Sequence, residues 1–292
     1  MRKIFCALIL LAIFAGFSGA RAMTRQVIKF GMITKLNTTE EQFAETWQKT
    51  FAPRNEDLSV IVKFYDNLTA MQMAMNAGEI NQMVLPEPTA QYVLNQNSDC
   101  ESVLVLRSKG MGLSFGFRED SSKLRDEFNT ALKELRESWT LPAIEGMYIS
   151  SSGAKEPEPV KFANFENAET IRIAVTGDLP PIDYIAPDGT PAGFNTAVLA
   201  EVAKFLHKNV KLVNIDSAAR TAALASKRVD VVFWYEVDKT SEFQADIPDG
   251  VIISEPYYEW EKFIHVKKAL KKTQSSQNWN INRSIMEMFF SW

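Results

Sequence analysis

A short polar run near the start of the chain has the chemistry to hold a small molecule. Asn37, Thr38 and Thr39 stand together just before an amphipathic segment. At a helix start, hydroxyl groups and unpaired backbone N–H groups suit the anionic or polar atoms of a ligand. Plain capping of the helix needs only Thr39. The run therefore predicts a ligand-binding turn, with helix capping as the alternative role.

A second run combines aromatic rings with a carboxylate. Trp234, Tyr235 and Glu236 end an apolar stretch that is typical of a strand. Two rings and an acid at a strand end can stack on a cationic or ring-bearing solute and neutralise it. In the alternative interpretation one ring belongs to the core and Glu236 is a solvated surface charge. Asp178 and Tyr184 are further candidates for ligand contact, although Asp178 also suits a turn.

Signals for catalysis are weak. The pattern G-x-S-x-G surrounds Ser114, but a nucleophile elbow needs a sharp turn between strand and helix at that serine. Ser114 instead lies inside a strand-like run that continues to Phe117. The two histidines, His207 and His265, stand at the end of an amphipathic helix and in an apolar strand, and no His or Cys spacing suggests zinc. We expect a protein that is not an enzyme and that holds no metal or cofactor.

Composition and charge set the outer limits. The chain has 292 residues, 46% of them hydrophobic and 23% charged, which fits one large or two modest globular domains. A net charge of −4 argues against nucleic acid as a partner, because phosphate binding needs a cationic surface.

The first residues predict export. Arg2 and Lys3 precede an apolar run at 4–14, and an A-x-A site follows at 20–22. This arrangement is typical of a secretory signal peptide over 1–22, and the apolar run falls short of the ~20 residues that cross a membrane. Its removal leaves a single cysteine, so no disulfide can form within the chain. We expect a soluble periplasmic or secreted protein.

Two β-α-β-α-β patterns follow, separated by a linker at 150–169 that is rich in Ser, Pro, Glu and Lys. Right-handed crossovers then predict a parallel sheet in each half. Thr39 and Gln42 have the spacing of a capping box, and Asn195 is expected to cap a helix. The predicted strands are 27–33, 58–64, 80–85, 171–176, 210–215 and 229–235.

Both halves also carry motifs of a known family. In the second half these are Gly177-Asp-Leu-Pro-Pro181, Asp188-Gly189, Gly193-Phe-Asn195, Arg228-Val-Asp230 and Ser254-Glu-Pro-Tyr-Tyr258. In the first half they are Gly31, Ala77-Gly-Glu-Ile80, Glu87-Pro-Thr-Ala-Gln-Tyr92 and Phe115-Gly-Phe-Arg118. The second half resembles the first lobe of the bacterial solute-binding proteins that serve amino-acid ABC transporters, which have the type II periplasmic binding protein fold. The first half is similar to the second lobe of the same family.

The resemblance implies an α/β fold of two Rossmann-like lobes in circularly permuted order, since close termini permit such a rearrangement. A fragment of a tandem array, made of halves of two neighbours, is the alternative. The expected division is a signal peptide at 1–22, a lobe 2-like domain at 23–149, the linker at 150–169, a lobe 1-like domain at 170–268, and a tail of unknown structure at 269–292.

The family's usual anchors for an amino acid have no match here. The arginine that clamps the carboxylate falls within 239–243, which contains no arginine. The acid that takes the ammonium falls at Pro86, which makes the adjacent Glu87 a candidate. The stacking aromatic falls at Leu179. Arg220 offers a replacement cation, although an arginine at a helix start is more often exposed. A standard α-amino acid is therefore a poor expectation.

Taken together, the sequence predicts a monomeric extracytoplasmic protein that captures a small polar, aromatic or cationic solute and presents it to an ABC permease. It would meet the membrane only through that transporter, and no nucleic acid is expected as a partner. Two alternatives remain. One is a sensory or interaction module that kept the fold and lost the transport ligand, and the other is a fold-related, dehydratase-like enzyme.

Overall fold

The computed structural model of the chain describes residues 26–51, 58–150, 156–236 and 247–269. The expected signal peptide at 1–22 and the tail from residue 270 onward lie outside the described residues.

Apolar runs form the strands of the first lobe. β1 pairs in parallel with both β2 and β3, as the β-α-β-α-β pattern predicts. Gly78, at a φ of 77°, ends the second helix and caps its last carbonyls. The elements of this lobe are β1 (Gln26–Ile33), α2 (Glu40–Phe51), β2 (Leu58–Tyr65), α3 (Leu68–Ala77), β3 (Gln82–Pro86) and α4 (Glu87–Gln96).

The second lobe repeats this arrangement. β5 pairs in parallel with β9 and β10. Its strands are β5 (Thr170–Val175), β9 (Asn209–Asn214), β10 (Val231–Glu236) and β11 (Val251–Ile253). Its helices are α5 (Ser122–Glu137), α6 (Thr140–Glu145), α7 (Phe194–Phe205) and α8 (Arg220–Ala225). A small antiparallel sheet of β6 (Asp178–Leu179), β7 (Asp183–Ile185) and β8 (Pro191–Ala192) lies beside them.

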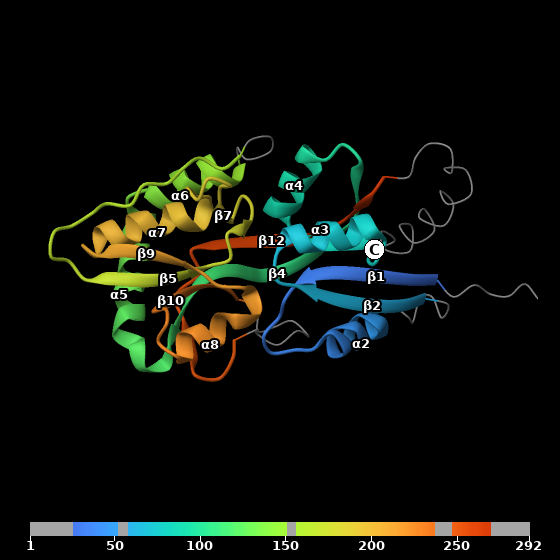
Figure 1. Ribbon diagram of the computed structural model, residues 1–292, viewed down its shortest axis with the longest axis horizontal. Helices are drawn as coiled ribbons and strands as arrows, with labels where there is room; N and C mark the ends of the chain where they lie inside the picture. Colours follow the sequence, from blue (N-terminus) through green and yellow to red (C-terminus); the bar gives the residue numbers. More distant parts are fainter. Residues whose placement is uncertain (1–25, 52–57, 151–155, 237–246, 270–292) are drawn as a thin grey trace, which may run out of the picture.

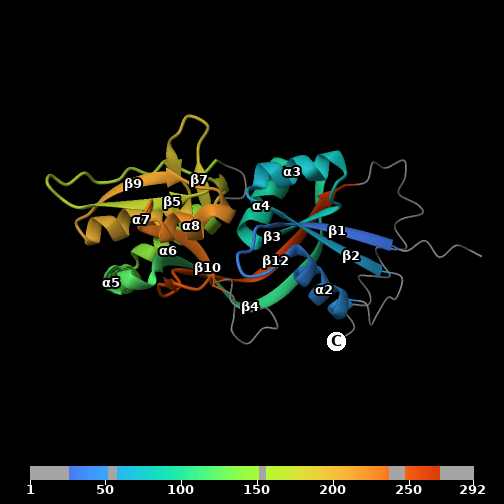
Figure 2. The same cartoon turned by 60° about the horizontal axis from the view of Figure 1, so that its bottom comes forward.

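Two long strands join the lobes. β4 (Cys100–Arg118) and β12 (Tyr258–Lys268) run through the middle of the molecule, between the two groups of helices (Figures 1 and 2). β12 pairs with the first lobe's β3 and with β4, while the end of β4 pairs with the second lobe's β10 and β11. The result is a single sheet in the order β2-β1-β3-β12-β4-β10-β5-β9. The expected α/β fold with two lobes is confirmed.

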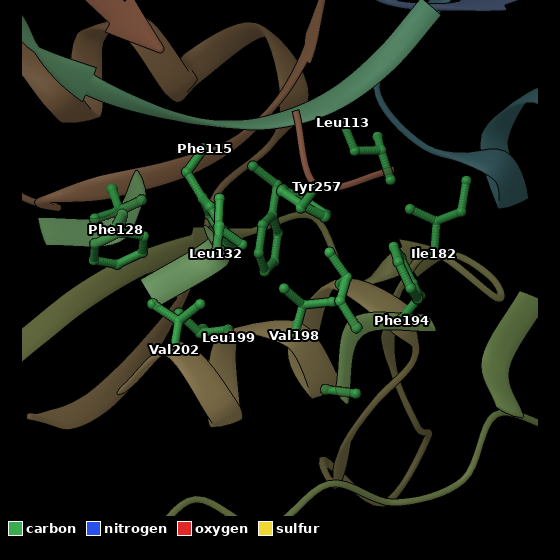
Figure 3. Close-up of a cluster of buried hydrophobic side chains, with 14 of the residues drawn as sticks. Leu113, Phe115, Phe128, Leu132, Ile182, Phe194, Val198, Leu199, Val202 and Tyr257 are labelled. Atoms are coloured by element: carbon green, nitrogen blue, oxygen red, sulfur yellow. The ribbon is translucent and has the colours of Figure 1, made fainter. Parts of the chain in front are cut away.

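The core of the second lobe explains the position of α5 and α6. Phe115 on β4 is fully buried, and its ring centroid lies 4.6 Å from that of Tyr257 (Figure 3). Leu132 of α5 and Val198 of α7 belong to the same buried cluster. Although α5 and α6 precede the linker in the sequence, they therefore pack against the lobe that follows it.

The prediction that Asn195 caps α7 is wrong. The helix begins at Phe194 after Gly193, which has a φ of 86° that favours glycine. Asn195 lies inside the first turn, is 2% exposed, and accepts a hydrogen bond of 2.8 Å from the Tyr257 hydroxyl. The side-chain oxygen of Asn195 is therefore paired with the buried Tyr257 hydroxyl and not with a backbone N–H of the helix end.

Within the described residues, no helix is long and apolar enough to span a membrane. In the same part of the chain, no cluster of three or more His, Cys, Asp or Glu residues is arranged to hold a metal ion. Ser114 lies within β4, four residues before its end, and is fully buried, which rules out a nucleophile elbow at this position.

Candidate functional site

A small cleft lies between the two lobes. Residues from the carboxyl ends of parallel strands meet there, the place where open α/β sheets bind ligands. The first lobe contributes Ile33, Asp66 and Asn67, and β4 contributes Leu113. The rest of the lining comes from the second lobe: Thr176, Asp178, Leu179, Asp183, Asn195, Ser217, Arg220 and Phe233.

The cleft is nearly closed in this conformation. The volume of the cleft that is open to the centre of a water molecule is about 10 Å³. That is roughly the room that one water molecule needs. A metabolite-sized solute therefore needs the lobes to move apart before it can enter.

Arg220 supplies the positive charge of the described lining. An arginine at a helix start is more often exposed, but Arg220, at the start of α8, is only 5% exposed. Its Nε donates to the Ser217 carbonyl and its Nη1 to the Phe233 carbonyl, both at 3.1 Å. Burial of a guanidinium requires such partners. These bonds hold the side chain in the wall of the cleft.

Asp183 balances part of that charge from inside the second lobe. Its carboxylate accepts hydrogen bonds from the backbone N–H groups of Thr176, at 2.9 Å, and Gly177, at 3.2 Å. Burial raises the pKa of Asp183, while these bonds and the nearby Arg220 oppose the rise. The residue thus fixes the turn that follows β5 and carries Asp178 into the cleft.

Two further carboxylates accept hydrogen bonds from the opposite lobe across the cleft. Asp178 Oδ2 accepts a hydrogen bond of 2.8 Å from the Thr69 N–H at the start of α3. Asp66 Oδ1 accepts one of 3.2 Å from the Ala218 N–H of the second lobe. With Asp183, the described lining holds three carboxylates against one guanidinium, which favours a positively charged group in the cleft.

Among the expected site residues, Asp178 lines the cleft and Tyr184 lies beside it. Tyr184 is paired with Asp178 across β6 and β7 and is 9% exposed. Burial, together with a hydrogen bond to the carboxylate of Glu156, raises the pKa of Tyr184 to about 12. The Tyr92 hydroxyl donates to the same carboxylate at 3.0 Å. Ligand contact by Asp178 and Tyr184 stays a prediction.

The run Asn37, Thr38 and Thr39 lies outside the residues that line the cleft. Thr39 and Gln42 form the predicted capping box, with reciprocal hydrogen bonds of 3.0 and 3.2 Å. The Thr38 hydroxyl donates to the Gln42 side chain at 3.4 Å. The Asn37 side-chain amide donates to the Ile247 carbonyl in the second lobe. The capping role is therefore present, and a ligand role for the run stays a prediction.

The other expected residues have different surroundings. Glu87 begins α4 and forms an ion pair of 3.0 Å with Lys262. Trp234, Tyr235 and Glu236 form the end of β10, where their backbone pairs with β4. Their side chains lie outside the described residues. The stretch 237–243, which includes the expected place of the missing arginine, lies outside them too.

Sequence reasoning did not single out Asp66, Asn67 and Ser217. Asp66 and Asn67 follow the end of β2 by one and two residues, and Ser217 follows the end of β9 by three. That position was readable in the sequence and could have identified them. The burial of Arg220 had no such signal, because its partners are backbone carbonyls.

Comparison with known proteins places the second half of the chain. The model of the bacterial extracellular solute-binding proteins, family 3, matches residues 171–288. Over these residues the chain is similar to that family. The match starts within β5 and continues through β12 to residue 288. The assignment of the first half to the other lobe, and with it the permuted order, stays a prediction.

Several solved structures resemble the fold at low identity. The zinc-bound ligand-binding component of an ABC-type import system from Staphylococcus aureus is 13% identical, with 90% of this chain and 71% of that one covered, at a TM-score of 0.45. The substrate-binding protein of a methionine transporter from Streptococcus pneumoniae is 11% identical, with 91% and 88% covered, at 0.43. The OxyR2 regulatory domain from Vibrio vulnificus is 10% identical, with 92% and 100% covered, at 0.42. No curated protein sequence matches the chain.

Proposed function

We propose that this solute-binding protein captures a small polar solute in the cleft between its lobes, outside the cytoplasm, and passes it to an ABC permease. One observation carries the proposal: residues at the strand ends of both lobes line one cleft that contains a buried Arg220. Enclosure by two lobes that close about connecting strands suits the capture of a small molecule. The family of residues 171–288 consists of binding proteins, which agrees with a function without catalysis.

The charge and shape of the lining support a solute with a cationic and an apolar or aromatic part. Carboxylates outnumber guanidinium groups in the described lining. A second hollow shares Ile33 with the cleft. The volume of this hollow that is open to the centre of a water molecule is about 30 Å³. Its walls are mostly apolar: Met32, Ile33, Val84, Pro86, Met111, Trp260 and Phe263, with Thr34 and Lys35. An aromatic or aliphatic group suits such a wall.

A thermal-shift screen with small amines, quaternary ammonium compounds and aromatic cations tests this proposal. A solute at a hundred times its Kd stabilises the folded state by about 2.7 kcal/mol, which raises the Tm by roughly 5–10 °C in a chain of this size. Ile33→Trp should abolish the shift, because the larger ring fills the space that both hollows share. Ile61→Trp is the matched control, since Ile61 lies exposed on the neighbouring strand. The proposal fails if no compound shifts the Tm, or if Ile33→Trp binds like the wild type.

The closed cleft also favours a second candidate, a sensory or interaction module that has kept the fold without a transport ligand. Two observations support it. The cleft has room for about one water molecule, and hydrogen bonds within the chain already connect the two lobes across it. This candidate predicts that no solute in the screen shifts the Tm while the lobes stay closed in solution. A solute whose effect Ile33→Trp abolishes would exclude it.

A further inference from the structure

A turn of the second lobe inserts into the core of the first. Leu179, which belongs to β6 of the second lobe, is 4% exposed. It lies in the first lobe's buried cluster, together with Leu68 and Met71 of α3. Opening the cleft would expose this side chain and leave a gap in that cluster, so burial of Leu179 favours the closed form.

The residue before it adds a directional bond at the same place. Asp178 Oδ2 accepts the hydrogen bond of 2.8 Å from the Thr69 N–H. That N–H belongs to the first turn of α3, where no carbonyl of the helix can accept it. A carboxylate is favoured at this end of a helix because the helix dipole is positive there. Asp178 therefore satisfies a donor of the other lobe that opening would return to water.

A reciprocal pair of contacts runs from the first lobe to the second. Leu36 of the first lobe packs against the second lobe's cluster around Ile215 and Leu224. Asn37, the next residue, donates to the Ile247 carbonyl. Each lobe thus places one leucine and one adjacent polar side chain on the other.

We propose that Asp178 and Leu179 form a latch that holds the lobes closed when no solute is bound, and that this pair must withdraw for a solute to enter. The inference rests on the proposed function, because it assigns a regulation to the same cleft. Where only a fraction of the molecules is open, the apparent affinity for a solute falls by that fraction. The latch therefore sets how strongly a solute must bind in order to be captured.

Hydrogen exchange and small-angle X-ray scattering on the purified protein without any solute test the latch. Asp178→Ala should speed exchange of the Thr69 amide by about tenfold, the effect of losing one hydrogen bond of ordinary strength. Leu179→Ala should increase the radius of gyration, as the lobes separate. Asp188→Ala is the matched control for the carboxylate, because Asp188 is exposed and bonds only within its own turn, to the Thr190 N–H. It should change neither quantity.

A second control separates opening from loss of stability. Leu68→Ala removes a leucine from the same cluster, but one that belongs to the first lobe itself. It should lower the free energy of unfolding without increasing the radius of gyration. Leu179→Ala should increase the radius of gyration, whether or not it also lowers the free energy of unfolding. The proposal is overturned if the wild type already has the radius of gyration of the Leu179→Ala variant, or if exchange at Thr69 is unaffected by Asp178→Ala. Because these measurements contain no solute, a screen without hits leaves their outcome unchanged, and a solute found in the screen does not rescue a failed latch.

Discussion

The stability of this protein should fall steeply in mild acid because of one histidine. His265 on β12 is fully buried, stacked on Trp47 with ring centroids 5.4 Å apart, and edge-on to Phe30 at 5.1 Å. Its Nδ1 lies 3.0 Å from Gln82 Oε1, and its Nε2 has no hydrogen-bond partner among the described residues. These surroundings hold a neutral ring and offer nothing to stabilise a second proton.

The size of the effect follows from the pKa. Burial lowers the pKa of His265 from 6.5 to about 3. Below pH 6.5 the unfolded chain therefore binds a proton that the folded chain does not, so stability is lost as the pH falls. Each pH unit in this window costs about 1.4 kcal/mol, which gives roughly 2–3 kcal/mol between pH 6.5 and 4.5 and about 5 kcal/mol near pH 3.

Urea unfolding at pH 7.5, 6.5, 5.5 and 4.5 measures this loss. His265→Phe keeps the ring packing on Trp47 and should flatten the pH dependence by the same 2–3 kcal/mol. It should itself cost about 1 kcal/mol at pH 7.5, because Gln82 loses its partner. His207→Asn is the control, because it removes the only other histidine of the chain. The φ of 53° at this position is one that asparagine tolerates. The explanation is wrong if His265→Phe loses stability in acid as steeply as the wild type.

Three further substitutions test the packing and capping described above, each by urea unfolding at pH 7.5. Gly31→Ala should cost about 1–3 kcal/mol, because an added Cβ would lie 2.4 Å from the side chain of Ile80. An added Cβ at Gly146 would meet nothing within 4 Å, so Gly146→Ala should be neutral or slightly stabilising. Thr39→Ala should cost about 1 kcal/mol through loss of the capping box, and an unchanged midpoint would contradict that role. Tyr257→Phe should cost about 1–3 kcal/mol, because it leaves the buried Asn195 oxygen unpaired.

Local structure was largely predictable from the sequence. Apolar runs bounded by polar turns marked the strands of both lobes, and the Thr39–Gln42 spacing marked the start of α2. These features depend on residues close together in the chain, so their signal is contained in short segments. Asn195 is the exception, because a distant tyrosine decides its role.

The joining of the lobes was not predictable in the same way. β4 is 19 residues long and changes partners along its length, from β12 in the first lobe to β10 and β11 in the second. Hydrophobic periodicity shows which residues are buried, but it does not show which strand pairs with which. The packing of α5 beside α7 has the same origin, since it depends on where β4 ends.

The candidate site was predictable only in part. Asp178 was identified as a candidate and lines the cleft, while Glu87 pairs with Lys262. Arg220 and Leu179 were weighed by comparison with the family's usual anchors. Their burial comes from contacts with residues far away in the sequence, so no local pattern could indicate it.

Capture of a solute between the lobes is tested most directly by hydrogen exchange on the complex with a solute from the thermal-shift screen. The account predicts that binding slows exchange on both sides of the cleft, in 66–70 of the first lobe and in 176–179 and 217–220 of the second. Protection confined to one lobe, or located on a distant surface, would contradict it.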